Sequence, residues 1–253
     1  MTSVLVTRPA GQADGLIQSL KAAGFDPVLH QPMLELLPLT EIPAPQRQCI
    51  VDLDLYQHII FISANAVRFG LARIDDYWPQ LPTGLNWYAI GESTAAILED
   101  RGVAVLTPGE QMSSEGLLAL PELDSVANQR VLIVKGVGGR DTLREVLSGR
   151  GAQVEEFACY RRACPVMASG ELAQSLQQAS IDVVLVSSGE GLQNMLTLLS
   201  DTESTKFKDI GLIVPSPRVA AQARQAGFND VVTAANASDA AMQQALQQWQ
   251  AGD

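Results

Sequence analysis

Hydroxyl-bearing and positively charged side chains recur in short segments that each follow an apolar run of the chain. In α/β sheets, ligands bind where strands end, because the free N–H groups and dipole of the following helix favour anions. These segments therefore predict a site for an anionic small molecule. Its candidate binding residues are Thr7, Arg8, Ser63, Ala64, Asn65, Ser93, Thr94, Lys135, Gly136, Arg140, Ser187, Ser188, Ser216 and Arg218. Helix capping for stability alone is the competing interpretation for Ser93, Ser188 and Ser216.

Tyr160 is the candidate for catalysis. It precedes Arg161 and Arg162 in a segment without helical periodicity, where its phenol can lie beside positive charge. A phenol with the ordinary pKa of about 10 is protonated at neutral pH and can donate its proton to a leaving group. Packing in an extended segment is the alternative role for this tyrosine.

Common catalytic signatures are missing from the sequence, which has no G-x-S-x-G elbow, no H-E-x-x-H pair and no G-x-x-x-x-G-K-[ST] phosphate loop. The turn from Lys135 to Arg140 resembles a dinucleotide-binding turn, but Asp141 occupies the place of its third glycine. His30 and His58 are the only histidines, and the three cysteines lack C-x-x-C spacing. We expect no metal site.

The elements that must position these residues alternate between short apolar runs and helix-period segments. Val4-Leu5-Val6 leads into a predicted helix over Gln12–Ala23, and the same order recurs at Val131–Val134 and Asp141–Arg150. Such alternation is typical of parallel sheets covered by helices on both faces. We predict an α/β fold.

The chain also repeats itself. Val4 and Val131 begin matching passages, as do Ile59 and Val183, and the loop from Gly91 matches the loop from Ser216. All three matches share nearly the same offset and order, which indicates an internal duplication. The alternative is that any two strand–helix units look alike. We therefore expect two similar parallel-sheet domains of flavodoxin-like type, joined by a two-stranded linker.

Residues 31–45 and 155–165 contain prolines or lack helical periodicity, and we interpret them as extended crossings between the domains. The predicted organisation is a discontinuous α/β domain of residues 1–36 plus 166–253 and an inserted α/β domain of residues 40–160, with linkers near 37–39 and 161–165. Two crossings would form a hinge, and we expect the working site in the cleft between the domains.

Composition limits the possible functions. The chain has 253 residues, 47% of them hydrophobic and 18% charged, so it can fold around two cores. A net charge of −11 opposes binding to nucleic acid or to anionic membranes unless a local basic patch reverses the field. The N-terminus shows no export signal. We expect a cytoplasmic protein, and no heptad pattern contradicts a monomer.

Several motifs together resemble uroporphyrinogen-III synthases. The resemblance is carried, in this order along the chain, by Leu5-Val6-Thr7-Arg8-Pro9 with Gln12, Phe61-Ile62-Ser63-Ala64-Asn65-Ala66-Val67, Ala89-Ile90-Gly91-Glu92-Ser93-Thr94-Ala95, Ser113-Ser114-Glu115-Gly116-Leu117-Leu118, Lys135-Gly136 with Gly139-Arg140, Tyr160-Arg161-Arg162 and Ser187-Ser188. It implies cyclisation of the linear tetrapyrrole hydroxymethylbilane to uroporphyrinogen III, with loss of water and inversion of the last pyrrole ring. It also implies a monomeric lyase of tetrapyrrole and heme biosynthesis that needs no metal or organic cofactor.

The resemblance further implies roles for single residues. Tyr160 matches the family's tyrosine that assists departure of the hydroxyl group, and Ser63 and Thr94 match hydroxyls that touch the substrate. Departure gives an azafulvene cation, which closes at the substituted carbon and rearranges through a spiro intermediate. Because the substrate carries acetate and propionate arms, we expect the basic residues to reverse the potential locally. These are Arg8, Lys135, Arg140 and Arg218.

Two other functions stay open on the residues alone. One is a two-lobed binding or regulatory protein that closes on an anionic small molecule without transforming it, because fold does not determine function. The other is a nucleotide-sugar or phosphosugar enzyme using the glycine-containing turn at Gly136–Gly139.

Overall fold

The structure, a computed structural model, describes residues 1–252, with Asp201 described by its backbone only. The chain forms two compact units: unit 1 is Met1–Leu36 with the chain from Ala163 onward, and unit 2 is Leu37–Arg162. The chain passes from unit 1 to unit 2 within strand β3 (Glu35–Pro38) and returns within β8 (Gln153–Ala163). The two strands are neighbours in the sheet of unit 2.

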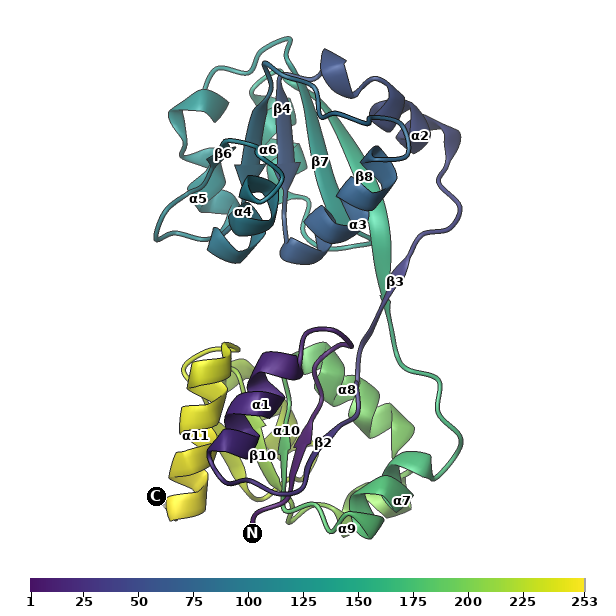
Figure 1. Cartoon of the computed structure of the whole chain (residues 1–253), viewed down its shortest axis with the longest axis vertical. Coiled ribbons are helices and arrows are strands. Elements are labelled where there is room, and N and C mark those ends of the chain that lie inside the picture. Colours follow the sequence, from purple (N-terminus) through teal and green to yellow (C-terminus); the bar gives the residue numbers. More distant parts are fainter. Residues whose placement is uncertain (253) are drawn as a thin grey trace. The chain divides into compact units, whose positions relative to one another are not determined.

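Unit 1 is a parallel sheet with helices on both faces (Figure 1). Its strand order is β2-β1-β9-β10-β11, which is the flavodoxin-like order. Its strands are β1 (Val4–Val6), β2 (Val28–His30), β9 (Val183–Leu185), β10 (Gly211–Val214) and β11 (Val231–Thr233). Its helices are α1 (Asp14–Ala22), α7 (Glu171–Gln178), α8 (Gly189–Leu198), α9 (Asp201–Lys206), α10 (Pro217–Gln225) and α11 (Asp239–Ala251).

The strands of unit 1 are buried on both faces, as their continuous apolar sequences predict. Val4 and Val6 of β1 pack with residues of α1 and α11, whereas Leu5 packs with residues of α7, α8 and α10. This alternation follows from the two-residue period of a strand. None of the helices in residues 1–252 is long and apolar enough to cross a membrane.

Unit 2 has the strand order β3-β8-β7-β4-β5-β6. Its further strands are β4 (His58–Phe61), β5 (Asn86–Ala89), β6 (Val105–Leu106) and β7 (Arg130–Gly136). Its helices are α2 (Ala44–Val51), α3 (Ala64–Ile74), α4 (Glu92–Glu99), α5 (Ser114–Leu118) and α6 (Thr142–Gly149), with 3₁₀ turns η1 (Leu53–Leu55) and η2 (Pro121–Leu123). Ile60 and Ile133 pack with residues of α5 and α6 on one face, and α3 packs against β7.

The strand orders of the two units correspond. Strands β8-β7-β4-β5-β6 of unit 2 follow the same spatial order as β2-β1-β9-β10-β11 of unit 1. The three sequence matches fall on corresponding elements, namely β7 with β1, β4 with β9, and the helix starts after β5 and β10. The predicted α/β fold with two similar parallel sheets is therefore confirmed.

Helix boundaries differ from the sequence expectation by one to two residues. Helix α1 begins at Asp14 rather than Gln12, and α6 begins at Thr142 rather than Asp141. The stretch 31–45, interpreted as extended, contains β3 but ends in the first turn of α2, which includes Pro45. Proline is tolerated there because the first N–H groups of a helix have no partner within the helix.

Candidate functional site

Tyr160 and Ser63 come together where the parallel strands of unit 2 end. Tyr160 lies in β8 opposite Gly136 of β7, and Ser63 follows β4. The phenol oxygen of Tyr160 lies 3.3 Å from the Ser63 Oγ. The tyrosine ring stacks on Phe69 of α3, with ring centroids 5.2 Å apart, and the residue is only 6% exposed.

Ser63 has two roles at this position. As the N-cap of α3, its Oγ accepts a hydrogen bond from the Ala66 backbone N–H at 3.0 Å. The hydroxyl hydrogen remains available to donate to the phenol oxygen, since a serine hydroxyl is both donor and acceptor. In that arrangement the proton of the Tyr160 hydroxyl is free to donate to a ligand.

The other predicted residues near β4 and β5 of unit 2 differ in exposure. Ala64 begins α3 and is half-buried, and the Asn65 Oδ1 accepts from Arg68 at 3.4 Å. Helix α4 is capped by Gly91, so Ser93 lies inside the helix and is exposed, and Thr94 is buried. Capping therefore does not explain Ser93.

Lys135 is a buried cation that already has acidic partners. Its Nζ lies 3.0 Å from the Glu156 carboxylate and 3.9 Å from that of Asp141, and the residue is 5% exposed. Arg140 is largely exposed and lies 3.4 Å from the carboxylate of Glu115. The Lys135 charge is thus largely compensated within unit 2, which the sequence did not predict.

A pocket of about 180 Å³ in unit 2 lies among these charges. Lys135, Arg140, Arg144 and Glu156 contribute its charged lining, and Ser114 contributes a hydroxyl. The remaining lining is apolar and consists of Ile62, Ile90, Ile133 and Leu143. A pocket that combines an apolar wall with guanidinium groups suits an organic anion, although Glu156 offsets part of its positive charge.

The candidate residues of unit 1 that precede α1 have structural partners. The buried Thr7 hydroxyl donates to the Leu185 carbonyl oxygen at 2.8 Å, which ties β1 to β9. The Arg8 guanidinium forms an ion pair with Asp239 in the first turn of α11 and donates to the Ala237 carbonyl oxygen. Arg8 therefore stabilises the start of α11.

The serines and the arginine at the other helix starts of unit 1 are arranged differently. Ser187 is half-buried. Ser188 caps α8, where its hydroxyl oxygen accepts a hydrogen bond from the Gly191 N–H at 3.0 Å. Ser216 caps α10 in the same way, accepting from the Val219 N–H at 3.4 Å. Capping is thus at least part of their role. Arg218 in the first turn of α10 is exposed, and no residue in the described range forms an ion pair or hydrogen bond with its guanidinium.

The pair of hydroxyls formed by Tyr160 and Ser63 in unit 2 has no equivalent in the described part of unit 1. Ser188 corresponds to Ser63, and Asn194 occupies the place in α8 that Phe69 occupies in α3. The Asn194 amide donates to the carbonyl oxygen of the buried Met33, which follows β2, the counterpart of β8. Unit 1 thus places a methionine where unit 2 places Tyr160.

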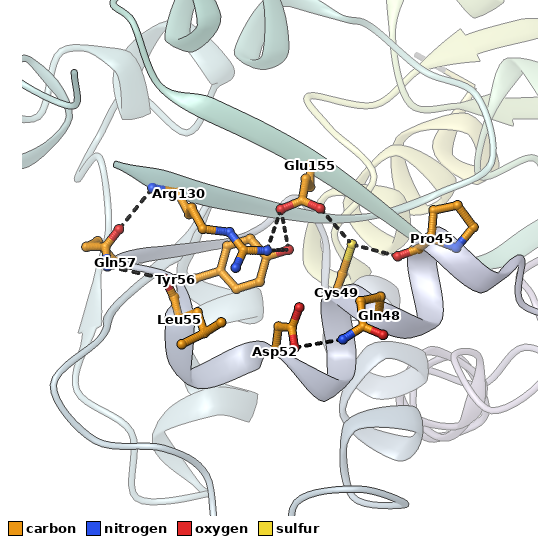
Figure 2. Close-up of polar contacts among 9 residues, drawn as sticks. All are labelled: Pro45, Gln48, Cys49, Asp52, Leu55, Tyr56, Gln57, Arg130 and Glu155. Atoms are coloured by element: carbon orange, nitrogen blue, oxygen red, sulfur yellow. Dashed lines mark hydrogen bonds and ion pairs between the residues drawn. The ribbon is translucent and has the colours of Figure 1, made fainter. Parts of the chain in front are cut away.

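Sequence reasoning missed a polar network near the N-terminal ends of β7 and β8, the opposite end of these strands from Tyr160 (Figure 2). The Tyr56 hydroxyl donates to Glu155 at 2.6 Å, Arg130 donates to the same carboxylate oxygen at 2.8 Å, and the guanidinium lies 4.3 Å from the Tyr56 ring centre. The Cys49 thiol donates to Glu155 at 3.6 Å, which joins α2 to β8.

Burial and hydrogen bonding shift the pKa values in this network. Burial raises the pKa of both Tyr56 and Cys49. Burial alone would raise the pKa of Glu155 as well, but the hydrogen bonds from Tyr56 and Arg130 lower it overall. The network holds a carboxylate ionised next to a neutral thiol, and its geometry indicates a structural role. Among the side chains that the structure describes, no group of three or more His, Cys, Asp or Glu could hold a metal ion.

Sequence comparison assigns the chain to a family. A model of the family "Uroporphyrinogen-III synthase HemD" matches residues 14–244. The chain belongs to the uroporphyrinogen-III synthase family. It is 34% identical over 252 residues to the uroporphyrinogen-III synthase of Escherichia coli, covering 97% of this chain and 100% of that protein. The corresponding enzyme of Salmonella typhimurium is 32% identical over 249 residues, with 97% and 100% coverage.

Solved structures of uroporphyrinogen-III synthases share the fold. The enzyme from Helicobacter pylori aligns with a TM-score of 0.64 at 14% identity, covering 98% of this chain and 100% of that one. A mutant enzyme from Thermus thermophilus aligns with a TM-score of 0.60 at 14% identity, with both chains fully covered. These likenesses agree with the two parallel-sheet units of this chain.

Two contacts that shape the candidate site were also missed, those of Phe69 with Tyr160 and of Glu156 with Lys135. Phe69 lies one helical turn beyond Ala66, whose N–H is capped by Ser63, so its spacing could have indicated that it shares a face with Ala66. Glu156 lies in the strand that follows β7 in the repeat, and strand adjacency could have indicated its pairing with Lys135.

Proposed function

We propose that this protein is a uroporphyrinogen-III synthase, a lyase that cyclises hydroxymethylbilane to uroporphyrinogen III with loss of water and inversion of ring D. The observation that carries the proposal is the family match over nearly the whole chain, joined to a tyrosine hydroxyl held beside Ser63 where the strands of unit 2 end. The same match favours the synthase over a two-lobed binding protein and over a phosphosugar enzyme.

Tyr160 is the group that assists departure of the substrate hydroxyl. Its phenol donates a hydrogen bond or a proton to the leaving oxygen, while Ser63 donates to the phenol oxygen and stabilises negative charge that develops there. The leaving hydroxyl takes up the proton and departs as water. The remaining azafulvene cation is then attacked by the substituted carbon of the last ring, ring D, and the resulting spiro intermediate rearranges with inversion of this ring.

The carboxylate arms of the substrate bind to cations and helix N-termini. In unit 1, Arg218 has no ion-pair partner among the described residues and lies at the start of α10, next to the start of α8. In unit 2, the pocket lined by Arg140 and Arg144 takes an arm of the substrate, with its apolar wall against the methylene groups. Arg8 and Lys135 act mainly through their ion pairs with Asp239 and Glu156.

Binding several arms at once fixes the folded conformation of a flexible substrate. The reactive azafulvene can close without help to the isomer in which ring D is not inverted. Holding the ring ends in the orientation for attack at the substituted carbon is worth several kcal/mol, because effective concentrations in oriented intramolecular reactions are high. Positioning is thus the main contribution of the protein, and Tyr160 adds acid assistance.

We also propose that the enzyme is cytoplasmic and works as a monomer. Light scattering of the purified chain at micromolar concentration tests the monomeric state.

The activity is tested by incubating the purified chain with freshly generated hydroxymethylbilane and separating the uroporphyrin isomers after oxidation. We expect predominance of the type III isomer, in proportion to the amount of protein. Formation of type I alone, at the same rate as without protein, would overturn the proposal and favour the binding-protein alternative. A heat-denatured sample of the same chain is the control.

A further inference from the structure

We propose that Gly136 is a positioning residue for Tyr160: a side chain at position 136 would displace the phenol from Ser63. The inference rests on the proposed function for its effect on turnover, although the contact itself can be tested without activity. A methyl group at position 136 would lie 2.7 Å from the Cζ and 3.0 Å from both Cε atoms of Tyr160. Real carbon contacts of this kind are essentially never shorter than 3.0 Å.

A bulge between β7 and β8 places the tyrosine over this glycine. The two strands pair regularly up to Lys135 opposite Ala158, and then the register shifts so that Gly136 lies opposite Tyr160. Cys159 is the extra residue, and its thiol donates to the Ala66 carbonyl oxygen of α3. Consecutive residues of a regular strand point to opposite faces, but here both Cys159 and Tyr160 contact α3. The bulge therefore turns the phenol toward Ser63.

The ring has little freedom to yield to an added methyl group. The ring stacks on Phe69, and the residue is only 6% exposed. The backbone of Tyr160 is also held, because its carbonyl oxygen accepts a hydrogen bond from the Val137 N–H at 2.8 Å. A clash at Cζ acts on the ring atom that carries the hydroxyl. Because the Ser63 contact is already 3.3 Å long, even a small shift of the ring breaks it.

The position of the ring is tested by ¹⁹F NMR of protein labelled with 3-fluorotyrosine. The chain has four tyrosines, and Tyr160→Phe assigns the resonance of Tyr160. We expect Gly136→Ala to move the Tyr160 resonance and leave those of Tyr56, Tyr77 and Tyr88 in place. The matched control is Gly211→Ala in unit 1, where a methyl group would meet the Trp249 ring at 2.6 Å. It should leave the Tyr160 resonance unchanged. An unmoved Tyr160 resonance in Gly136→Ala would overturn the inference.

The effect on catalysis is tested by a double-mutant cycle, which isolates the coupling between two residues. We expect Gly136→Ala to lower kcat about tenfold in the wild-type background, and by less than about twofold in Tyr160→Phe, where the hydroxyl is already missing. Gly211→Ala should leave kcat unchanged. Equal losses from Gly136→Ala in both backgrounds would show that the glycine acts independently of the phenol and would contradict the inference.

Unfolding of Gly136→Ala would still leave the contact testable. In that case the double variant of Gly136→Ala with Tyr160→Ala, which removes the ring, should fold, because the added methyl group no longer meets the Tyr160 ring. A double variant that stays unfolded would contradict the inference. If the unaltered protein makes no type III isomer, the proposed function fails, and the NMR comparison alone decides whether Gly136 positions the ring.

Discussion

The phenol oxygen of Tyr160 and the Oγ of Ser63 lie 3.3 Å apart although the residues are 97 positions apart in the sequence. Tyr160 lies in strand β8 and Ser63 is the N-cap of α3, so the contact depends on the order of the strands in the sheet of unit 2. The same serine accepts from Ala66 N–H. Helix stability and placement of the phenol are thus linked through one hydroxyl group.

Variants of Ser63 separate these two functions. Ser63→Thr keeps both the cap and the hydroxyl and should keep kcat within about twofold. Ser63→Gly keeps most of the capping stability, since glycine is a tolerated N-cap, but should lower kcat several-fold, by about the value of one hydrogen bond. Ser200→Ala, which removes the cap of α9 in unit 1, is the control and should lower the melting temperature but not kcat. Equal kcat in Ser63→Thr and Ser63→Gly would contradict the link to Tyr160.

Removal of the Glu156 charge should strengthen substrate binding. Glu156→Gln leaves the Lys135 ammonium without its nearest anion, at 3.0 Å, and makes the adjoining pocket more positive. We expect KM for the polyanionic substrate to fall about two- to fivefold in low salt, and by less in about 0.5 M salt because of screening. Steady-state kinetics at the two salt concentrations measures this. An unchanged or higher KM at both would argue against an arm of the substrate in this pocket.

Arg218 and Arg8 should respond differently to substitution. Arg218 has no ion-pair partner in the described range, so Arg218→Gln should raise KM several-fold with little change in melting temperature. Arg8 is paired with Asp239 at the start of α11, so Arg8→Gln should lower the free energy of unfolding by about 1 kcal/mol. Thermal unfolding and substrate titration of both variants test the contrast. A normal KM for Arg218→Gln would remove this arginine from the binding site.

The network around Glu155 should make stability depend on pH. Its pKa in the folded protein is lowered from 4.5, so the ionised carboxylate stabilises the fold above pH 4.5, and this stabilisation is lost as the pH falls through the folded-state value. Glu155→Gln should lower the free energy of unfolding by about 1 kcal/mol at pH 7, because the pair is partly exposed. The difference from wild type should shrink below pH 4 in urea titrations. A constant difference across this range would contradict the assignment to ionised Glu155.

The fold could be predicted from the sequence because it is encoded in local patterns. Val4-Leu5-Val6 and Val131–Val134 have the continuous apolar character of buried parallel strands, and the repeat fixes which strands correspond. The helix starts at Ser188 and Ser216 follow from capping preferences. These signals need no knowledge of distant contacts.

The arrangement of the candidate site depends on contacts that local patterns do not encode. Lys135 and Arg8 look alike as charges at strand ends, but their partners Glu156 and Asp239 lie in other elements. The bulge that turns Tyr160 toward α3 arises from pairing between β7 and β8, and the sequence has no local signal for it. Sequence reasoning therefore named candidate residues more readily than it predicted their charge state or orientation.

The central claim, that the Tyr160 hydroxyl assists loss of water, is tested most directly by kcat of Tyr160→Phe with hydroxymethylbilane. Phenylalanine retains the stack on Phe69, so the fold should persist, with a melting temperature within a few degrees of wild type. We predict a fall in kcat of about tenfold, the loss of one hydrogen bond of about 1.4 kcal/mol in the transition state, with type III still the main enzymatic product. A kcat equal to that of wild type would contradict the claim.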